Sequence, residues 1–219
     1  MTPTRNPDLT WRGEVPVSTR FDDPYFSLGG GLDEARHVFL DGNGLPARLR
    51  PGFHVAELGF GTGVNLLALA QIAGNTPLRF TSFEAFPMGR EDMARAHEAF
   101  PELAPLAAEL RPGIAAGGPF RVGAVTAEII IGDARETLPS WDGLADAWFL
   151  DGFAPARNPE LWGEALLGQV ARHTAPGGSF ATYTAAGAVR EALAAAGFAV
   201  ERRPGFGRKR HMSCGRLSG

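Results

Sequence analysis

The sequence feature that most constrains the fold is the glycine-rich stretch at residues 55–65, VAELGFGTGVN. It begins as a short apolar strand, turns on Gly59, Gly61 and Gly63, and continues into the apolar residues 66–70, which are typical of a helix. Glycines at a strand-to-helix turn let the backbone approach a ligand that any side chain would exclude. The stretch therefore predicts an α/β unit with a nucleotide-like ligand at the turn.

The spacing of the glycines narrows the class of ligand. A dinucleotide fingerprint requires G-x-G-x-x-G, whereas position 64 here is Val. Glu57, at the end of the strand, would repel a pyrophosphate and suits an ammonium, such as the amino-acid end of S-adenosylmethionine. The pattern E-x-G-x-G-x-G resembles the first motif of the Rossmann-like methyltransferases. A glycine-rich turn without a ligand and a nucleotide-dependent oxidoreductase are the alternatives.

Length and composition favour one domain. The chain has 219 residues, 44% of them apolar, which is enough for a single α/β domain with a sizeable core. We expect residues 1–50 to form an N-terminal extension or lid, packed on a methyltransferase domain of residues 51–219. The N-terminus has no signal-peptide pattern, and no apolar run approaches the roughly 18 residues that span a bilayer. With one cysteine, Cys214, an internal disulfide and a cysteine metal cluster are excluded, so we expect a cytoplasmic protein without metal or membrane partner.

Strands and helices alternate from Phe53 onward. The predicted strands are 53–58, 78–84, 127–131, 145–150 and 179–184, followed by an antiparallel pair at 198–203 and 210–217. The predicted helices between them are 64–73, 89–99, 102–110, 159–172 and 186–196, and residues 120–125 read as a hairpin. This order predicts a mainly parallel, seven-stranded sheet with helices on both faces. Upstream, 33–40 reads as a short helix entering a strand and 41–44 as a hairpin turn.

Each of the four central strands ends at an acid. Ligands of such sheets bind beyond the carboxyl ends of the strands. Like charges gathered there would repel one another unless the ligand between them carries cations or hydroxyl groups. The four acids are Glu57, Glu84, Asp133 and Asp151.

Two of these acids suit the nucleoside part of such a ligand. Glu84 could accept hydrogen bonds from two ribose hydroxyls, and its alternative is a solvated acid at a strand end. Asp133 could accept from the adenine amino group, with Ala134 leaving space for the ring. Its alternative, an N-cap for the helix that follows, is compatible with binding.

The loop from Asp151 to Pro155 suits the transfer of a methyl group to an amine. It resembles the acid-Pro-Pro-aromatic loop of amino-group methyltransferases, although Gly152 and Ala154 replace the usual residues. An amine must be unprotonated to attack, and positive charge moves onto the nitrogen as the new bond forms. The Asp151 carboxylate can receive the proton, and the face of Phe153 favours the developing cation, so both are the predicted catalytic residues.

Two further stretches suggest contacts outside the cofactor site. The aromatic and acidic residues 21–27 precede three glycines and could form a lid over a ligand or a hydrophobic plug under a loop. The net charge of −3 argues against a globally basic nucleic-acid binder, but a local patch suffices for one RNA feature. Such a patch contains Arg202, Arg203, Arg208, Lys209, Arg210 and Arg216.

Several blocks together resemble one family. They are residues 21–27, 57–65, 82–87, 146–155 with Asn158-Pro159, 175–178, and 205–210 with the sequence GFGRKR. They resemble the methyltransferase domain of MnmC, the tRNA 5-methylaminomethyl-2-thiouridine biosynthesis protein, from about residue 10 to residue 217. The resemblance implies a class I S-adenosylmethionine-dependent fold. It also implies methyl transfer to the amine of 5-aminomethyluridine, optionally 2-thiolated, at the wobble position of the tRNA anticodon.

The resemblance also implies roles for individual residues. The implied cofactor-binding residues are Glu57, Gly59, Gly61, Thr62, Asn65, Glu84, Asp133, Ala134 and Asp151. Asp151 and Phe153 would meet the amine, and Tyr25 and Phe26 would close over the pocket. Arg208, Lys209 and Arg210 would contact phosphates of the tRNA anticodon arm.

One departure from the family concerns the source of the amine. Many members are fused to a flavin-dependent oxidase, whereas this sequence stops at Gly219, so we expect the stand-alone form. The amine would then come from a separate flavin oxidase or from upstream wobble-uridine modification enzymes. The alternatives are a methyltransferase of the same fold acting on a small-molecule amine or hydroxyl, and a binding module for S-adenosylmethionine or RNA without turnover.

Overall fold

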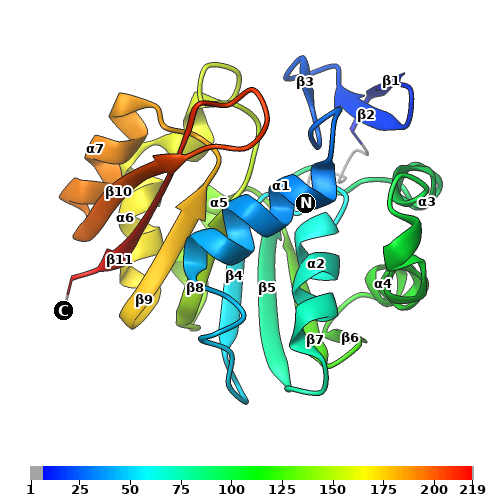
Figure 1. Cartoon of the computed structure of the whole chain (residues 1–219), viewed down its shortest axis with the longest axis horizontal. Helices are drawn as coiled ribbons and strands as arrows, with labels where there is room; N and C mark the ends of the chain where they lie inside the picture. The colour runs from blue at the N-terminus through cyan, green and yellow to red at the C-terminus, as the bar shows by residue number, and fades with distance from the viewer. Residues whose placement is uncertain (1–6, 219) are drawn as a thin grey trace.

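The computed structural model describes residues 7–218, and its centre is an eight-stranded β-sheet (Figure 1). The strands of this sheet are β4 (His54–Leu58), β5 (Leu78–Glu84), β6 (Phe120–Val122), β7 (Val125–Ile131), β8 (Ala145–Leu150), β9 (Thr174–Thr182), β10 (Phe198–Pro204) and β11 (His211–Leu217). Their order is β10-β11-β9-β8-β4-β5-β7-β6. The pairs joining β9, β8, β4, β5 and β7 are parallel, and the outer pairs are antiparallel. The mainly parallel sheet is confirmed, with β6 of the predicted hairpin as an eighth strand.

Helices cover both faces of the sheet, as predicted. They are α1 (Gly31–Ala35), α2 (Val64–Ala73), α3 (Arg90–His97), α4 (Ala104–Ala116), α5 (Ala134–Thr137), α6 (Glu164–Arg172) and α7 (Gly187–Ala195). One buried apolar cluster lies under α1 to α4 and a second lies under α5 to α7. Successive side chains of β8 alternate between them, because neighbouring residues of a strand point to opposite faces. Ala147 and Phe149 join the first cluster, and Trp148 and Leu150 join the second.

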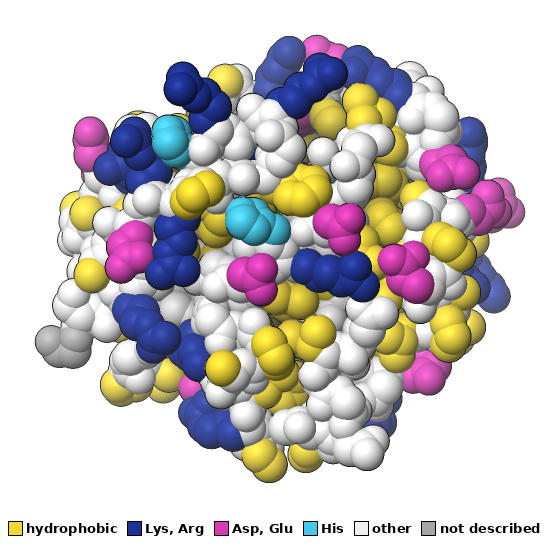
Figure 2. Space-filling view, viewed as in Figure 1, with side chains coloured by type: hydrophobic (Ala, Val, Ile, Leu, Met, Phe, Trp, Pro, Cys, Tyr) yellow, Lys and Arg dark blue, Asp and Glu magenta, His cyan; other side chains and the backbone are white. Residues whose placement is uncertain are grey.

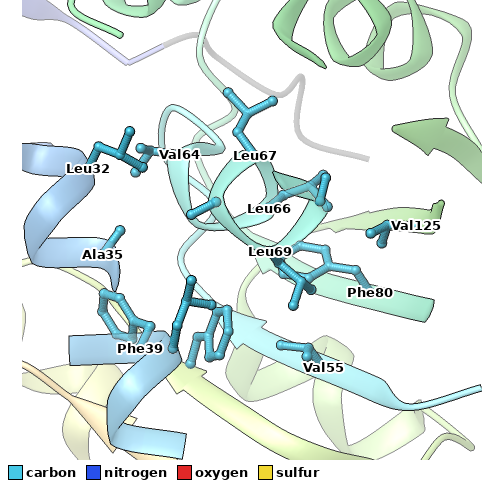
Figure 3. Close-up of a cluster of buried hydrophobic side chains, with 14 of the residues drawn as sticks. Leu32, Ala35, Phe39, Val55, Val64, Leu66, Leu67, Leu69, Phe80 and Val125 are labelled. Atoms are coloured by element: carbon cyan, nitrogen blue, oxygen red, sulfur yellow. The ribbon is translucent and has the colours of Figure 1, made fainter. Parts of the chain in front are cut away.

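The segment before β4 differs from the prediction. Residues 33–40 were expected to pass from a helix into a strand, but α1 continues into a π-helical turn, η1 (Arg36–Leu40), and a 3₁₀ turn, η2 (Asp41–Asn43). Leu32, Ala35 and Phe39 lie on one side of this helix and point toward α2 and the sheet (Figure 3). Their spacing is helical, so packing against the first cluster decides the structure over the strand preference of Val38 and Phe39.

A small antiparallel sheet precedes the main domain. Its strands are β1 (Leu9–Arg12), β2 (Val15–Ser18) and β3 (Asp23–Pro24), with β2 in the middle. Val15 and Val17 of β2 are buried. In Figure 1 this sheet stands at the upper end of the molecule, beside the N-terminal end of α1. Residues 1–6 of the predicted extension lie outside the described residues. No helix among residues 7–218 is long and apolar enough to cross a membrane.

The remaining connections are short helical turns. They are the 3₁₀ turns η3 (Pro101–Leu103), η4 (Leu138–Ser140) and η5 (Pro159–Trp162). The last of these belongs to the segment that follows β8, and its Trp162 is buried against the second cluster. This turn and Gly163 separate the Asp151 loop from α6. The helix therefore begins at Glu164, five residues later than the predicted start at residue 159.

Candidate active site

A cavity of about 870 Å³ opens at the carboxyl ends of the parallel strands. Its size falls within the usual range of small-molecule sites. The predicted site residues that line it are Tyr25, Phe26, Gly59, Gly61, Thr62, Asn65, Glu84, Asp133, Ala134, Asp151, Phe153, Arg208 and Lys209. Glu57 and Arg210 are absent from its lining. The topology therefore brings together residues from almost every block that the sequence singled out.

The glycine-rich turn packs directly against the loop that follows β8. Gly59 has a φ of +85°, and a β-carbon there would overlap the backbone oxygen of Asp151. The Asp151 amide donates a 3.1 Å hydrogen bond to the Leu58 carbonyl, which fixes the two segments side by side. Glycine at position 59 is thus required for the close approach of two backbones, in addition to any role in admitting a ligand.

One amide joins the two most deeply placed acids. The side-chain nitrogen of Asn65 lies 2.8 Å from Oε1 of Glu57 and 2.8 Å from Oδ2 of Asp151, and the Ser82 hydroxyl donates to Glu57 at 2.7 Å. Glu57 is 0% exposed, so it reaches the cavity only through Asn65. The sequence predicted a direct contact between Glu57 and the ligand, whereas in the structure Asn65 lies between Glu57 and the cavity.

The environment raises the pKa of both acids. Burial is the main cause for Glu57, followed by repulsion from Asp151, and together they raise its pKa well above the usual range. Burial raises the pKa of Asp151 to about 7, with the Asn65 hydrogen bond opposing the shift. A carboxylate that titrates near neutrality inside a cavity is suited to exchanging protons with a ligand.

Glu84 ends β5 with its carboxylate directed by backbone amides. The amide of Gly61 donates to Oε2 at 3.0 Å, and that of Phe86 donates to Oε1 at 2.7 Å. Burial raises the pKa of Glu84, while these backbone hydrogen bonds lower it. A carboxylate has about four acceptor sites, so both oxygens keep capacity for further donors from the cavity.

Asp133 caps the helix that follows β7. Its Oδ1 accepts a 2.9 Å hydrogen bond from the Arg135 amide, and the Arg135 guanidinium lies against the same carboxylate. The Arg135 side chain is the main reason that the pKa of Asp133 is lowered. Asp133 and the buried Ala134 also line the cavity, so the capping interpretation is confirmed without excluding ligand contact.

Aromatic rings enclose the loop that carries Asp151. Phe153 stacks on Phe21 with ring centroids 4.6 Å apart, and Tyr25 meets it edge-on at 5.0 Å. Asp23 Oδ2 accepts a 2.8 Å hydrogen bond from the Ala154 amide. The aromatic segment thus holds the loop from above, although Phe26 itself is buried against Phe100, as the plug interpretation expects.

Tyr183 and Trp162, which follow the loop in the sequence, donate hydrogen bonds to its backbone. The Tyr183 hydroxyl donates to the Gly152 carbonyl at 2.7 Å, and the Trp162 indole nitrogen donates to the Phe153 carbonyl at 2.9 Å. Burial raises the pKa of Tyr183, so the hydroxyl keeps its proton and remains a donor. No sequence pattern marks these two roles, because they depend on the return of β9 and η5 to the loop.

The predicted basic patch is divided by the fold. Arg208 and Arg210 lie in the exposed connection between β10 and β11, whereas Arg216 pairs with Ala199 at the opposite end of that hairpin. Figure 2 shows Lys and Arg side chains gathered along the upper margin of the molecule, the end at which the β10–β11 connection lies in Figure 1. Lys209 turns inward and lies 2.8 Å from Glu34, a residue that no sequence pattern indicates.

The residues of the cavity fit S-adenosylmethionine. Oδ1 of Asn65 is buried and has no hydrogen-bond partner among the described residues, so a donor such as the ammonium of the amino-acid end would satisfy it. Glu84 retains acceptor capacity for ribose hydroxyls, and Phe83 and Ala134 supply apolar surface for a base. Residues 7–218 contain no group of three or more His, Cys, Asp or Glu side chains placed to hold a metal ion.

Comparisons with known proteins indicate the class of protein that the chain resembles. A family model described as S-adenosyl-L-methionine-dependent methyltransferase matches residues 112–218. The tRNA 5-methylaminomethyl-2-thiouridine biosynthesis bifunctional protein MnmC of Chromobacterium violaceum is 46% identical over 228 residues, which cover 94% of this chain and 34% of that protein. The chain thus spans about a third of the length of this relative.

Solved structures agree on the fold. The crystal structure of MNMC2 from Aquifex aeolicus matches with a TM-score of 0.74 at 23% identity, over 100% of this chain and 72% of that chain. An O-methyltransferase family protein from Burkholderia thailandensis matches with a TM-score of 0.51 at 16% identity, over 86% of this chain and 55% of that chain. The fold is that of a class I S-adenosylmethionine-dependent methyltransferase.

The chain matches the S-adenosyl-L-methionine-dependent methyltransferases in sequence over residues 112–218 and resembles them in fold. Its resemblance to the methyltransferase domain of MnmC is also confirmed.

Proposed function

We propose that this protein transfers a methyl group from S-adenosylmethionine to the primary amine of 5-aminomethyluridine, optionally 2-thiolated, at the wobble position of tRNA. The product is 5-methylaminomethyl(-2-thio)uridine. The observation that carries the proposal is the Asp151 carboxylate, whose pKa burial raises to about 7, in the same cavity as the Phe153 ring. The 46% identity to a protein named for this biosynthesis supports the choice of substrate.

The cofactor supplies an electrophilic methyl group on a positively charged sulfur. Asn65 would accept a hydrogen bond from its ammonium, and Glu57, held by Ser82, orients Asn65 from the side away from the cavity. Glu84 would accept hydrogen bonds from the ribose hydroxyls, and Asp133 and Ala134 would border the base. Gly59, Gly61 and Thr62 form the turn that leaves room for the ligand beside them.

Asp151 handles the proton of the acceptor. An alkyl amine is largely an ammonium ion at neutral pH, and it must lose a proton before nitrogen can attack. An oxygen of the Asp151 carboxylate takes that proton, which a group titrating near 7 does efficiently because it is often deprotonated and still basic. The Phe153 ring then favours the positive charge that returns to nitrogen as it gains the methyl group.

The outer residues hold the nucleic acid and close the pocket. Tyr25 and Phe26 border the cavity from the N-terminal segment, where a base extended from the anticodon would enter. Arg208 borders the cavity, Arg210 lies two residues further along the same exposed connection, and both would contact phosphates. With this substrate the protein works in the cytoplasm, and its amine comes from a separate flavin oxidase or upstream wobble-uridine modification enzymes.

The test is methyl transfer from labelled S-adenosylmethionine to tRNA that carries 5-aminomethyluridine. We expect label in the wobble nucleoside, identified after digestion by chromatography and mass spectrometry. Transfer RNA that already carries the methylated base, and the Asp151→Asn variant, are the controls. A parallel incubation with a pool of small-molecule amines and hydroxyl compounds tests the alternative substrate class. Label in that pool and none in the tRNA would overturn the proposal.

A further inference from the structure

The cavity already holds a primary ammonium group that belongs to the protein. Nζ of Lys209 lies 2.8 Å from Oε1 of Glu34 and 3.9 Å from the centroid of the Tyr183 ring. Both charged residues line the cavity that contains Asp151. A carboxylate and an aromatic face are the groups expected around an alkylammonium ligand.

This ion pair lies close to the catalytic loop. Tyr183, whose ring meets the ammonium, also donates to the carbonyl of Gly152, the residue after Asp151. The charges of Glu34 and Lys209 both act on Asp151, since Glu34 raises its pKa and Lys209 lowers it. Glu34 and Asp151 are therefore two carboxylates of the same cavity, and the charge of one raises the pKa of the other.

The loop that carries Lys209 is held to α1 by contacts other than the ion pair. A β-carbon on Gly30 would lie 3.4 Å from Phe206, and His37 Nε2 lies 3.0 Å from the Pro204 carbonyl. Gly30, Glu34 and His37 fall on one face of the helical segment, so Phe206 and Pro204 of the loop contact this face on both sides of Glu34. The Lys209 side chain can leave Glu34 without releasing the loop.

The two partners differ in their exposure to solvent. The Glu34 side chain is 11% exposed, whereas that of Lys209 is 44% exposed. The lysine can therefore return to water readily, but the carboxylate would remain nearly buried and in need of a cation. An incoming ammonium that replaces Lys209 would leave Glu34 paired with one cation, as it is in the free protein.

We propose that Glu34 is the carboxylate that receives the ammonium of the methyl acceptor, and that Lys209 occupies this position until the acceptor displaces it. The inference rests on the proposed function, because it assumes that the acceptor is a primary amine. It assigns Lys209 a role different from that of Arg208 and Arg210. It also predicts selection against a 5-hydroxymethyl base, which has no charge to exchange with Lys209.

The test compares binding of two anticodon stem-loop RNAs that differ only in carrying 5-aminomethyluridine or 5-hydroxymethyluridine. Because the phosphate contacts contribute equally to both affinities, the ratio of the two affinities reports the contribution of the ammonium group. We expect Glu34→Gln to reduce the preference for the amine by about 10-fold or more, the scale of a hydrogen bond to a charged group. Lys209→Met removes the competing cation, so it should raise the preference several-fold. The neighbouring Asp33→Asn is the matched control, since Asp33 is on the same helix with a side chain that is 66% exposed.

The two variants are expected to change the preference for the amine in opposite directions, which distinguishes this role from an ion pair that only holds the structure together, here called a clasp. A clasp predicts that Glu34→Gln and Lys209→Met weaken amine binding alike, and that result would overturn the inference. An unchanged preference in Glu34→Gln would overturn it too. Thermal unfolding checks that each variant is folded, and Glu34→Asp, which keeps the charge but shortens its reach, serves as a second variant with an intermediate preference expected. Wild-type methylation of aminomethyl tRNA is scored separately, so its failure would count against the proposed function.

Discussion

The side-chain nitrogen of Asn65 donates a 2.8 Å hydrogen bond to Oδ2 of Asp151, so a residue of α2 fixes the carboxylate that follows β8. The same nitrogen serves Glu57, which is buried one strand away. A neutral amide holds Asp151 in place without supplying a positive charge, and burial can therefore raise its pKa to about 7. Asn65 thus fixes the geometry of the carboxylate, and burial raises its pKa by more than the Asn65 hydrogen bond lowers it.

Replacing Asp151 by Asn should separate catalysis from cofactor binding. The variant keeps the shape of the side chain but cannot accept the proton of the amine. We expect kcat to fall by about 100-fold or more, the usual scale for an acid-base residue. Titration calorimetry with S-adenosylhomocysteine should show that cofactor binding is partly retained. An Asp151→Asn variant with near wild-type kcat would contradict the proton-accepting role.

The wild-type rate should depend on pH through Asp151. Since the carboxylate must be deprotonated to act as a base, kcat should rise as the pH increases through about 7 and then level off. Single-turnover rates measured from about pH 5.5 to about pH 8.5 test this. Glu34→Gln should move the rise to lower pH, because the Glu34 charge raises the pKa of Asp151. A rate independent of pH over this range would exclude Asp151 as the group that limits the reaction.

The ionised form of Asp151 should lower the free energy of unfolding at alkaline pH. Its pKa is about 4 in an unfolded chain and about 7 in the folded state, so between these values the folded protein binds the extra proton. The contribution to stability is present below about pH 4 and is lost as the pH rises through about 7. Asp151→Asn, which cannot ionise, should therefore be more stable than wild type by on the order of 2 kcal/mol at about pH 8, with little difference at about pH 4.

Urea unfolding of both proteins at these two pH values, without ligand, measures the difference. An equal gain at both pH values would indicate a packing effect instead. The loss of stability on ionisation is the expected cost of keeping a basic carboxylate out of water.

Gly59→Ala should damage the site through the backbone. The added methyl group would overlap the Asp151 carbonyl, and the residue would have to keep a φ of +85°. We expect a loss of about 2 kcal/mol or more in unfolding free energy and a loss of S-adenosylhomocysteine binding. Gly74→Ala is the matched control, since it has a φ of +55° and nothing within 4 Å of its β-carbon position. Equal effects of the two substitutions would show that backbone strain alone is responsible.

Neutral substitutions at Arg208 and Arg210 should weaken tRNA binding and reduce its salt dependence. Each phosphate contact that is lost lowers the slope of log affinity against log salt by about 0.7 to 0.9. A double change to Gln, assayed by filter binding across a salt series, tests this. Arg216→Gln is the control, because that residue lies at the far end of the hairpin. An unchanged slope in the double variant would contradict the phosphate contacts, and adding a neutral change at Lys209 should alter the slope less than either arginine does.

The sequence predicted the sheet and the cavity lining because both follow from local patterns. Glycines at 59, 61 and 63 and an acid at each strand end depend only on neighbouring residues and on the rule that ligands bind at the carboxyl ends. Ser82 shows the limit of such patterns. Its hydroxyl donates a hydrogen bond to Glu57, but the sequence around a serine inside a strand does not indicate which residue it will contact.

Long-range contacts account for what the sequence did not predict. Glu34 lies in a segment whose second half was read as a strand, so its place in the cavity could not be foreseen, and the partner that turns it inward is 175 residues away. Glu57 was expected to meet the ligand, but whether an acid at a strand end faces the cavity or the core depends on the neighbouring strand. Arg216 was grouped with Arg208 by distance along the chain, and the antiparallel register separates them.

The hydrogen bond between Asp23 and the Ala154 amide spans 131 residues. During synthesis the N-terminal strands leave the ribosome well before the loop to which Asp23 attaches, so they must wait for most of the domain to appear. Contacts of such sequence separation form late and slow folding. The loop that carries Asp151 therefore reaches its final shape only after the N-terminal strands have contacted it. The active site is thus expected to form late in folding.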